Sequence, residues 1–116
     1  MSMEPAKLKF PKCRRLGGRT EFSAIRAAGP SRWRGPLGFR ILPNSLAYTR
    51  IGISIGRHVG SAVRRNRIKR LIREAFRLEQ HRLPAGLDVL ISVRKHEPMG
   101  LEQYQGILRD SLKSCA

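Results

Sequence analysis

The sequence predicts a single α+β domain in which helices and strands pack as a compact sandwich. Three observations support this fold class: a long amphipathic segment at 62–82, a largely aliphatic run at 87–93, and alternating isoleucines that end at Ile55. A helical period between strand-like runs is typical of a mixed α and β chain. A length of 116 residues suffices for one modest core. We therefore expect the order helix, two or more strands, helix, strand, helix.

The first helix is expected to begin at Thr20. Thr20 is a suitable N-cap, an acidic residue follows in the first turn, and the Gly-Pro pair at 29–30 ends the segment. Phe22 and Ile25 share one face of this helix. Phe22 is therefore either a core residue or an exposed ring for stacking, and composition alone favours the core. The preceding residues 1–15 are predicted to form a flexible basic arm, and residues 16–116 the folded domain.

Two strands are expected next, at 37–42 and 47–55, separated by turn residues at 43–45. In the second strand isoleucines alternate with small residues, which makes one face apolar. The small residues are Gly52, Ser54 and Gly56. Their face is consistent with a ligand-facing surface. The segment 31–36 is expected to be a loop, and its Arg-Trp-Arg triplet suits nucleic-acid contact and packing on the domain equally.

The segment 62–82 separates apolar and basic residues onto opposite sides of a helix, and Ser61 is its natural N-cap. The apolar side consists of Ile68, Leu71, Ile72, Ala75 and Phe76, with Leu78 at its edge. The opposite side consists of Ala62, Asn66, Lys69, Arg70, Arg73 and Arg77, flanked by Arg65 and Arg67. Glu74 and Glu79 lie off this basic side, so we expect no acid to neutralise it.

The last two elements complete the core. The run at 87–93 has the length and β-branched content of a buried strand, and a parallel partner suits it because a helix precedes it. The final helix is predicted from apolar residues at helical spacing: Leu101, Tyr104, Ile107, Leu108 and Leu112.

The charge balance points to a polyanionic partner. The chain has 24 Lys and Arg against eight Asp and Glu, a net charge of +16, which attracts RNA, DNA or an anionic membrane. Most charged helix faces are merely solvated, but this one is rich in Arg, whose planar fork suits phosphate. No segment approaches the roughly 18 apolar residues of a membrane span, and the N-terminus lacks the apolar part of a signal peptide. We therefore expect a cytoplasmic protein.

The residues that carry enzymatic chemistry are scattered. The eight acids form no DxD, ExE or HxxE group, and the chain has no phosphate-binding Gly-rich motif and no CxxC pair. Cys13 and Cys115 lie near the two ends without zinc-ligand spacing. We therefore expect no metal site and no catalytic residue. The residues alone predict a nucleic-acid-binding domain, with RNA and DNA both open.

A specific motif carries a family resemblance. Within 50–76, RIGISIGRHVGSAVRRNRIKRLIREAF, an Ala-Val pair precedes Arg-Asn-Arg, Lys-Arg and a further Arg. These are Ala62, Val63, Arg65, Asn66, Arg67, Lys69, Arg70 and Arg73. Together with Arg15, Leu16 and Phe22, this pattern resembles the protein component of bacterial ribonuclease P over nearly the full length.

The resemblance implies an αβββαβα two-layer sandwich, ribosomal protein S5 domain 2-like, with a left-handed βαβ crossover instead of the usual right-handed one. It also implies a protein subunit that binds a catalytic RNA and the 5′ leader of precursor tRNA, as a monomer with one copy per RNA. The RNA then carries out Mg²⁺-dependent removal of the leader, and the protein binds no Mg²⁺ tightly. A ribosomal or general RNA-binding protein is the alternative.

The resemblance also implies site residues. The RNA contacts are Arg57, Arg65, Asn66, Arg67, Lys69, Arg70 and Arg73. A leader-binding cleft is expected at Phe22, Arg26 and Ser54, which turns Phe22 into a stacking ring. Arg26 stands where many members have a second aromatic, so a phosphate or cation–π contact replaces one stack. His58 stands where Lys is common, which makes its charge depend on pH.

Overall fold

The computed structural model describes residues 19–27 and 31–113. The predicted arm at 1–15, Cys13 and Cys115 lie outside this part. The elements follow the predicted αβββαβα order, with a short 3-10 turn η3 before the long helix. They are α1 (Arg19–Arg26), β1 (Arg32–Arg34), β2 (Leu37–Pro43), β3 (Arg50–Ile55), η3 (Arg57–Val59), α2 (Ala62–Glu79), β4 (Leu87–Val93) and α3 (Leu101–Leu112).

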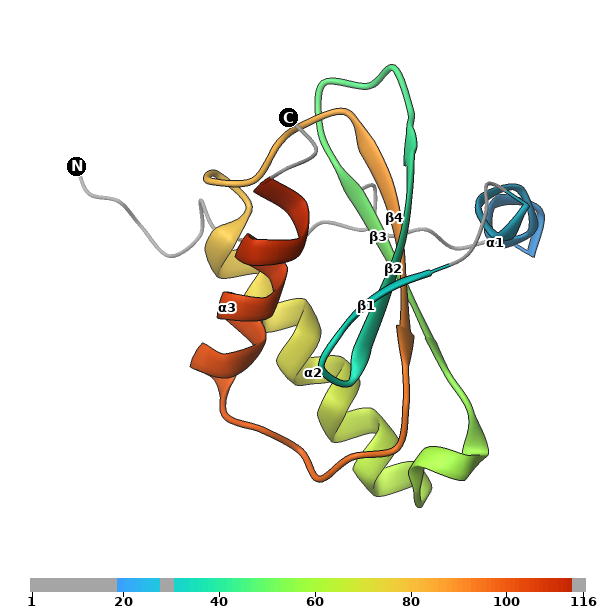
Figure 1. The fold of residues 1–116 in the computed structure, drawn as a ribbon, viewed down its shortest axis with the longest axis vertical. Coiled ribbons are helices and arrows are strands. Elements are labelled where there is room, and N and C mark those ends of the chain that lie inside the picture. Colours follow the sequence, from blue (N-terminus) through green and yellow to red (C-terminus); the bar gives the residue numbers. More distant parts are fainter. Residues whose placement is uncertain (1–18, 28–30, 114–116) are drawn as a thin grey trace.

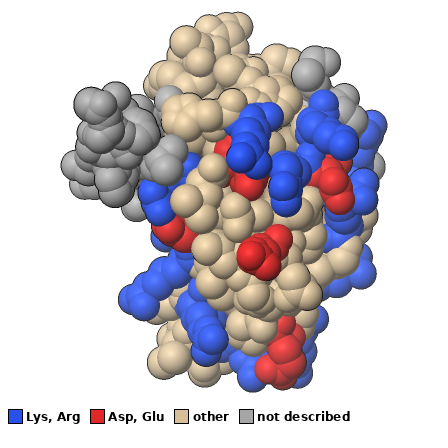
Figure 2. All heavy atoms as spheres, turned by 90° about the vertical axis from the view of Figure 1, so that its left-hand side faces the viewer, with Lys and Arg blue, Asp and Glu red and all other residues tan. Residues whose placement is uncertain are grey.

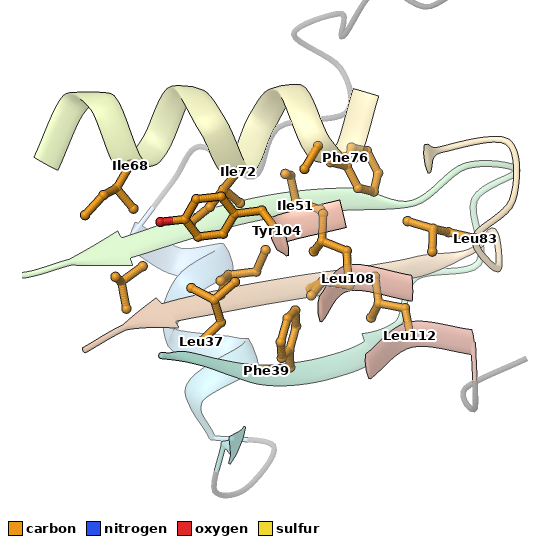
Figure 3. Packing of buried hydrophobic residues seen from close by; sticks show 14 of the residues in the cluster. Leu37, Phe39, Ile51, Ile68, Ile72, Phe76, Leu83, Tyr104, Leu108 and Leu112 are labelled. Atoms are coloured by element: carbon orange, nitrogen blue, oxygen red, sulfur yellow. The ribbon is translucent and has the colours of Figure 1, made fainter. Parts of the chain in front are cut away.

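The four strands form one mixed sheet in the order β1-β2-β4-β3. β1 with β2 and β2 with β4 are antiparallel, whereas β3 and β4 are parallel, with Ile51 opposite Val89. The parallel partner expected for 87–93 is therefore β3. The helix α2 connects these two strands and lies on the face of the sheet that α3 also covers. This crossover is left-handed (Figure 1, Figure 3).

The main core lies between the sheet and the layer formed by α2 and α3, which together make the predicted two-layer sandwich (Figure 1). Ile68, Ile72 and Phe76 of α2 point toward the sheet, where they meet alternate strand residues (Figure 3). The predicted final helix closes this core because Tyr104, Leu108 and Leu112 are fully buried. The apolar faces predicted for both long helices are thus confirmed.

The helix α1 packs on the opposite face of the sheet (Figure 1). Its Ile25 is buried against Leu90 of β4, with Leu42 of β2 alongside. Leu90 alternates with Val89 and Ile91, which point into the main core. The strand β4 is therefore covered on both faces, in agreement with the well-buried strand predicted from its aliphatic residues.

The expectation of a loop at 31–36 is wrong, because the Arg-Trp-Arg triplet forms the edge strand β1. A two-residue turn reverses the chain, and its Gly35 has φ +61, a conformation that glycine adopts without steric cost. Trp33 then pairs with Gly38. Three residues are too few for an alternating pattern to show in the sequence.

The strand predicted at 47–55 begins only at Arg50, because side chains organise the residues before it. Asn44 Oδ1 accepts a hydrogen bond from the Leu46 N–H at 2.7 Å, and Asn44 Nδ2 donates to the Tyr48 carbonyl at 3.2 Å. Thr49 Oγ1 donates to the Pro84 carbonyl at 2.7 Å. The Asn44 bonds satisfy the Leu46 N–H and the Tyr48 carbonyl, backbone groups that would otherwise pair with a neighbouring strand.

Candidate nucleic-acid interface

The start of α2 is fixed by its N-cap, as predicted. Ser61 Oγ accepts a hydrogen bond from the Arg64 N–H at 3.2 Å. The preceding segment forms η3 in place of the expected plain loop, and Val59 anchors it in the core. Arg57, on the same turn, is exposed. The turn therefore places a cation beside the helix start, where free N–H groups already favour an anion.

We define the α2 basic surface as Arg57, Arg65, Asn66, Arg67, Lys69, Arg70 and Arg73, the seven residues predicted to contact RNA. Four of them are exposed and three are half-buried; the exposed ones are Arg57, Asn66, Arg67 and Arg70. On the opposite side of α2, Ile68 and Ile72 are completely buried. The structure thus gathers the predicted residues on one helix and its preceding turn, with the exposed ones facing outward and the half-buried ones at the border of the apolar side.

One residue of the α2 basic surface, Arg65, also bonds to the turn before the helix. Arg65 Nε donates to the Gly60 carbonyl at 3.2 Å, which ties the guanidinium to the turn before the helix. This bond restricts how far the Arg65 side chain moves, so it reduces the entropy lost when an anion binds. Burial raises the pKa of the Tyr104 phenol, whereas the hydrogen bond from the Met99 N–H and the positive charge of Arg67 act against that rise.

The prediction that no acid neutralises the basic side of α2 is wrong at its C-terminal end. Arg77 Nε donates to Glu74 Oε1 at 2.9 Å, and Arg77 Nη2 bonds the second carboxylate oxygen. This pair lowers the pKa of Glu74 and raises that of Arg77. Side chains three residues apart meet across one helical turn, which the angular projection alone did not show. The α2 basic surface therefore ends at Arg73.

Glu79, as predicted, lies off the basic side and is buried between α2 and α3. Gln105 Nε2 donates to its Oε2 at 2.9 Å, and Arg109 Nε lies 3.7 Å from its Oε1. The outward face of α2 and α3 carries Asp and Glu interspersed with Lys and Arg (Figure 2). Positive charge is therefore partly compensated on that face.

A second candidate surface lies between α1 and the sheet. Arg26 Nη2 donates to Ser54 Oγ at 3.1 Å, so two of the three residues predicted for leader binding are in contact. Phe22 belongs to α1, but its side chain lies outside the described part. The small face predicted for β3 therefore points toward α1, whereas Ile51, Ile53 and Ile55 contact the main core.

The register extends this surface across the sheet in a way the sequence did not reveal. Ser54 pairs with Ser92, Ser92 pairs with Gly38, and Gly38 pairs with Trp33. We call Gly38, Ser92 and Ser54 the small-residue row. Directly paired residues point to the same face of a sheet, and here that face is the one with α1. Finding this row requires knowing which strands pair, because its members come from three distant segments.

The buried ion pair of this face is structural. Arg50 Nε and Nη2 donate to the two Asp88 oxygens at 2.8 and 2.6 Å, and Asn44 Nδ2 donates to Asp88 Oδ1 at 2.8 Å. Arg50 and Asp88 are direct neighbours across the parallel pair β3 and β4. The two parallel hydrogen bonds join the strands and engage the guanidinium of Arg50.

Among residues 19–27 and 31–113, no three His, Cys, Asp or Glu side chains lie close enough together to hold a metal ion. Nor does this part of the chain contain a helix of the length and apolarity needed to cross a membrane.

Comparison with known proteins places this chain in a family. A family model described as Ribonuclease P matches residues 10–115. The chain belongs to the ribonuclease P protein family. The ribonuclease P protein component of Desulforapulum autotrophicum is 34% identical over 87 residues, covering 75% of this chain and 74% of that protein. That of Syntrophus aciditrophicus is 36% identical over 85 residues, covering 73% and 71%.

Solved structures agree with the family assignment. The ribonuclease P protein of Thermotoga maritima superposes with a TM-score of 0.77 at 31% identity, covering 86% of this chain and 96% of that one. The Staphylococcus aureus ribonuclease P protein gives a TM-score of 0.76 at 29% identity, covering 90% and 96%. The fold, including the parallel β3 and β4 pair joined by α2, is therefore that of the ribonuclease P protein family.

Proposed function

We propose that this chain is the cytoplasmic protein subunit of ribonuclease P and binds its catalytic RNA, one protein per RNA, through the α2 basic surface. The observation that carries the proposal is the clustering of the basic motif along α2, with its exposed members on the outward side of the helix. Arg67 and Arg70 are exposed there, and no acidic side chain of the described part pairs with them. Arginine forks in this arrangement suit the phosphates of a folded RNA.

The 5′ leader of precursor tRNA binds, in this proposal, between α1 and the small-residue row. The contact of Arg26 with Ser54 supports this position, because it presents a guanidinium beside a hydroxyl and small side chains. The exposed guanidinium suits a backbone phosphate, and the small side chains let a strand approach the sheet closely. Such a surface holds a single strand without reading every base.

Hydrolysis belongs to the RNA in this proposal, which assigns the protein a positioning role. Mg²⁺ prefers carboxylate ligands and phosphate oxygens, and the described side chains offer no carboxylate cluster. Phosphates of the RNA would hold the Mg²⁺ ions, which would supply the activation of water. The protein's cations lower the repulsion between two polyanions, so fewer ions from solution are required.

Reconstitution with a bacterial ribonuclease P RNA tests the proposal. At low Mg²⁺ concentration, adding the chain should restore removal of the leader from precursor tRNA and yield mature 5′ ends. Protein without RNA should not cleave. An Arg67→Ala, Arg70→Ala double variant should require more Mg²⁺ for the same rate, while an Arg32→Ala, Arg34→Ala double variant of the exposed strand β1 serves as the charge-matched control. Absence of stimulation by the unaltered chain, with retention on ribosomal RNA instead, would favour a general RNA-binding protein.

Leader binding requires its own comparison. Precursor tRNA should bind the holoenzyme more tightly than the leaderless tRNA does, and Arg26→Ala should reduce that difference without affecting the leaderless substrate. Equal binding of both substrates by the unaltered holoenzyme would contradict the leader assignment while leaving RNA binding by α2 intact.

A further inference from the structure

The opposite end of the small-residue row carries a stacked pair that the proposed function does not use. The Trp33 ring lies on Gly38: a Cβ at position 38 would come within 2.8 Å of the Trp33 Cε2 atom. The Arg94 guanidinium lies over the same ring, with Cζ 3.9 Å from the ring centroid. Glycine at 38 therefore provides the space in which the indole settles on the sheet.

This pair is held in place but open to solvent. The Arg94 N–H donates to the Pro36 carbonyl at 2.9 Å, which fixes the Arg94 backbone beside the hairpin of β1 and β2. Trp33 nevertheless remains 44% exposed, and Arg94 is exposed as well. A Trp that served only the core would be covered more completely. We call Trp33 and Arg94 the Trp33 platform.

The Trp33 platform and the Arg26–Ser54 contact lie at the two ends of one line across the sheet. Each step from Ser54 to Ser92, Gly38 and Trp33 crosses one strand. Three strand spacings of about 4.8 Å give roughly 14 Å between the two ends. Only small residues lie between them, so an extended single strand can cross the row and reach the platform.

The chemistry of the platform suits a nucleobase. Bases in single-stranded RNA stack on aromatic rings and on arginine planes, and the guanidinium adds attraction for the adjoining phosphate. Lys95, the next residue, is also exposed and adds positive charge where the strand would leave the sheet. A peptide or an apolar partner would not be favoured by this concentration of cations.

We propose that an upstream base of the 5′ leader stacks on the Trp33 platform after the leader has crossed the small-residue row. The inference rests on the proposed leader binding and extends it to a second, more distant contact. It predicts that leaders long enough to cross the sheet are bound more tightly than shorter ones. Stacking of one base accounts for a gain of at least about fivefold in affinity.

Trp33 is the only tryptophan of the chain, so its fluorescence reports on this one position in the holoenzyme. Precursor tRNAs whose leader is lengthened one nucleotide at a time are added to the assembled holoenzyme. Fluorescence should stay unchanged with leaderless tRNA and short leaders, then be quenched once the leader reaches the platform. Quenching on assembly with the catalytic RNA alone would assign the base to that RNA and overturn the leader assignment.

Variants distinguish stacking on the Trp33 platform from a general effect of positive charge on RNA binding. Arg94→Ala and Gly38→Ala, which displaces the ring, should each lose the extra affinity for long leaders, whereas binding of short leaders should be retained. Arg32→Ala is the control, since it removes an exposed arginine of β1 that points to the other face. Trp33→Phe keeps a smaller ring and should lose part of the gain.

The failure of this inference is distinguishable from failure of the proposed function. If long and short leaders bind equally and Trp33 fluorescence never changes, while leadered substrates still bind better than leaderless ones, the platform is overturned and leader binding near Arg26 stands. If Arg32→Ala reduces the affinity as much as Arg94→Ala does, the effect is general electrostatics and the stacking contact is wrong.

Discussion

Replacing Arg70 with alanine should weaken binding of the catalytic RNA and reduce its dependence on salt, whereas replacing Arg77 should change both far less. The two arginines lie seven residues apart on α2 and share its outward side. Arg70 is exposed without an acidic partner in the described part, while Arg77 is bonded to Glu74. The pair of variants therefore compares an arginine available to phosphate with one already compensated.

The size of the effect follows from the number of cations. If about five residues of the α2 basic surface contact phosphates, the slope of log affinity against log salt is roughly −3.5, at about −0.7 per contact. Arg70→Ala should make the slope less steep by about 0.7 and cost about tenfold in affinity, the value of one charge-assisted contact of about 1.4 kcal/mol. Glu74→Gln releases Arg77 and should steepen the slope by up to about 0.7.

Filter binding or fluorescence anisotropy with the catalytic RNA, repeated over a range of salt concentrations, measures these slopes. Circular dichroism and urea unfolding establish that each variant remains folded, which is expected because the side chains are on the outward side of α2. The reasoning is refuted if Arg70→Ala and Arg77→Ala change the slope equally, or if the unaltered chain shows no salt dependence.

Three further predictions concern stability. Asp88→Ala should lower the free energy of unfolding by about 2–3 kcal/mol, because it removes the carboxylate to which Arg50 and Asn44 donate hydrogen bonds; urea unfolding measures this, and an unchanged midpoint would contradict it. Ser61→Ala removes the cap of α2 and should cost about 1 kcal/mol in the same assay, while Ser61→Asn should retain most of the stability. Burial raises the pKa of Tyr104 from its ordinary value of 10.0, so the unfolded chain releases the phenol proton first. The stabilisation of the fold by the protonated Tyr104 phenol is fully present below about pH 10 and is lost as pH rises through the folded-state pKa. Tyr104→Phe should remove this alkaline loss of stability, which thermal unfolding over a range of pH measures.

Local patterns predicted the helices well because helical side-chain spacing is a property of the segment itself. The period at 62–82 located α2 and separated Ile68 and Ile72 from Arg70 before any packing was known. Its C-terminal end was less well predicted, since α2 ends at Glu79. Arg77 illustrates a related limit, because whether Glu74 compensates its charge depends on the rotamers that bring the two side chains together.

Strand predictions depended more on the rest of the molecule. The run at 87–93 was long and aliphatic enough to predict its strand correctly, because both of its faces are covered. By contrast, β1 has three residues and all of them are exposed, so its sequence carries no pattern of burial. The start of β3 was also misplaced, since hydrogen bonds of Thr49 with the distant Pro84 segment compete with strand pairing.

By itself, the sequence determined that one helix carries apolar and basic sides, that the basic motif is that of the ribonuclease P protein family, and that acids are scattered. Only the tertiary structure decided that Ser54, Ser92, Gly38 and Trp33 stand in one line, and that Arg94 covers the ring. Helical periodicity repeats within a few residues and can be read locally. A row across a sheet exists only once distant segments pair in one register, and no single segment encodes that register.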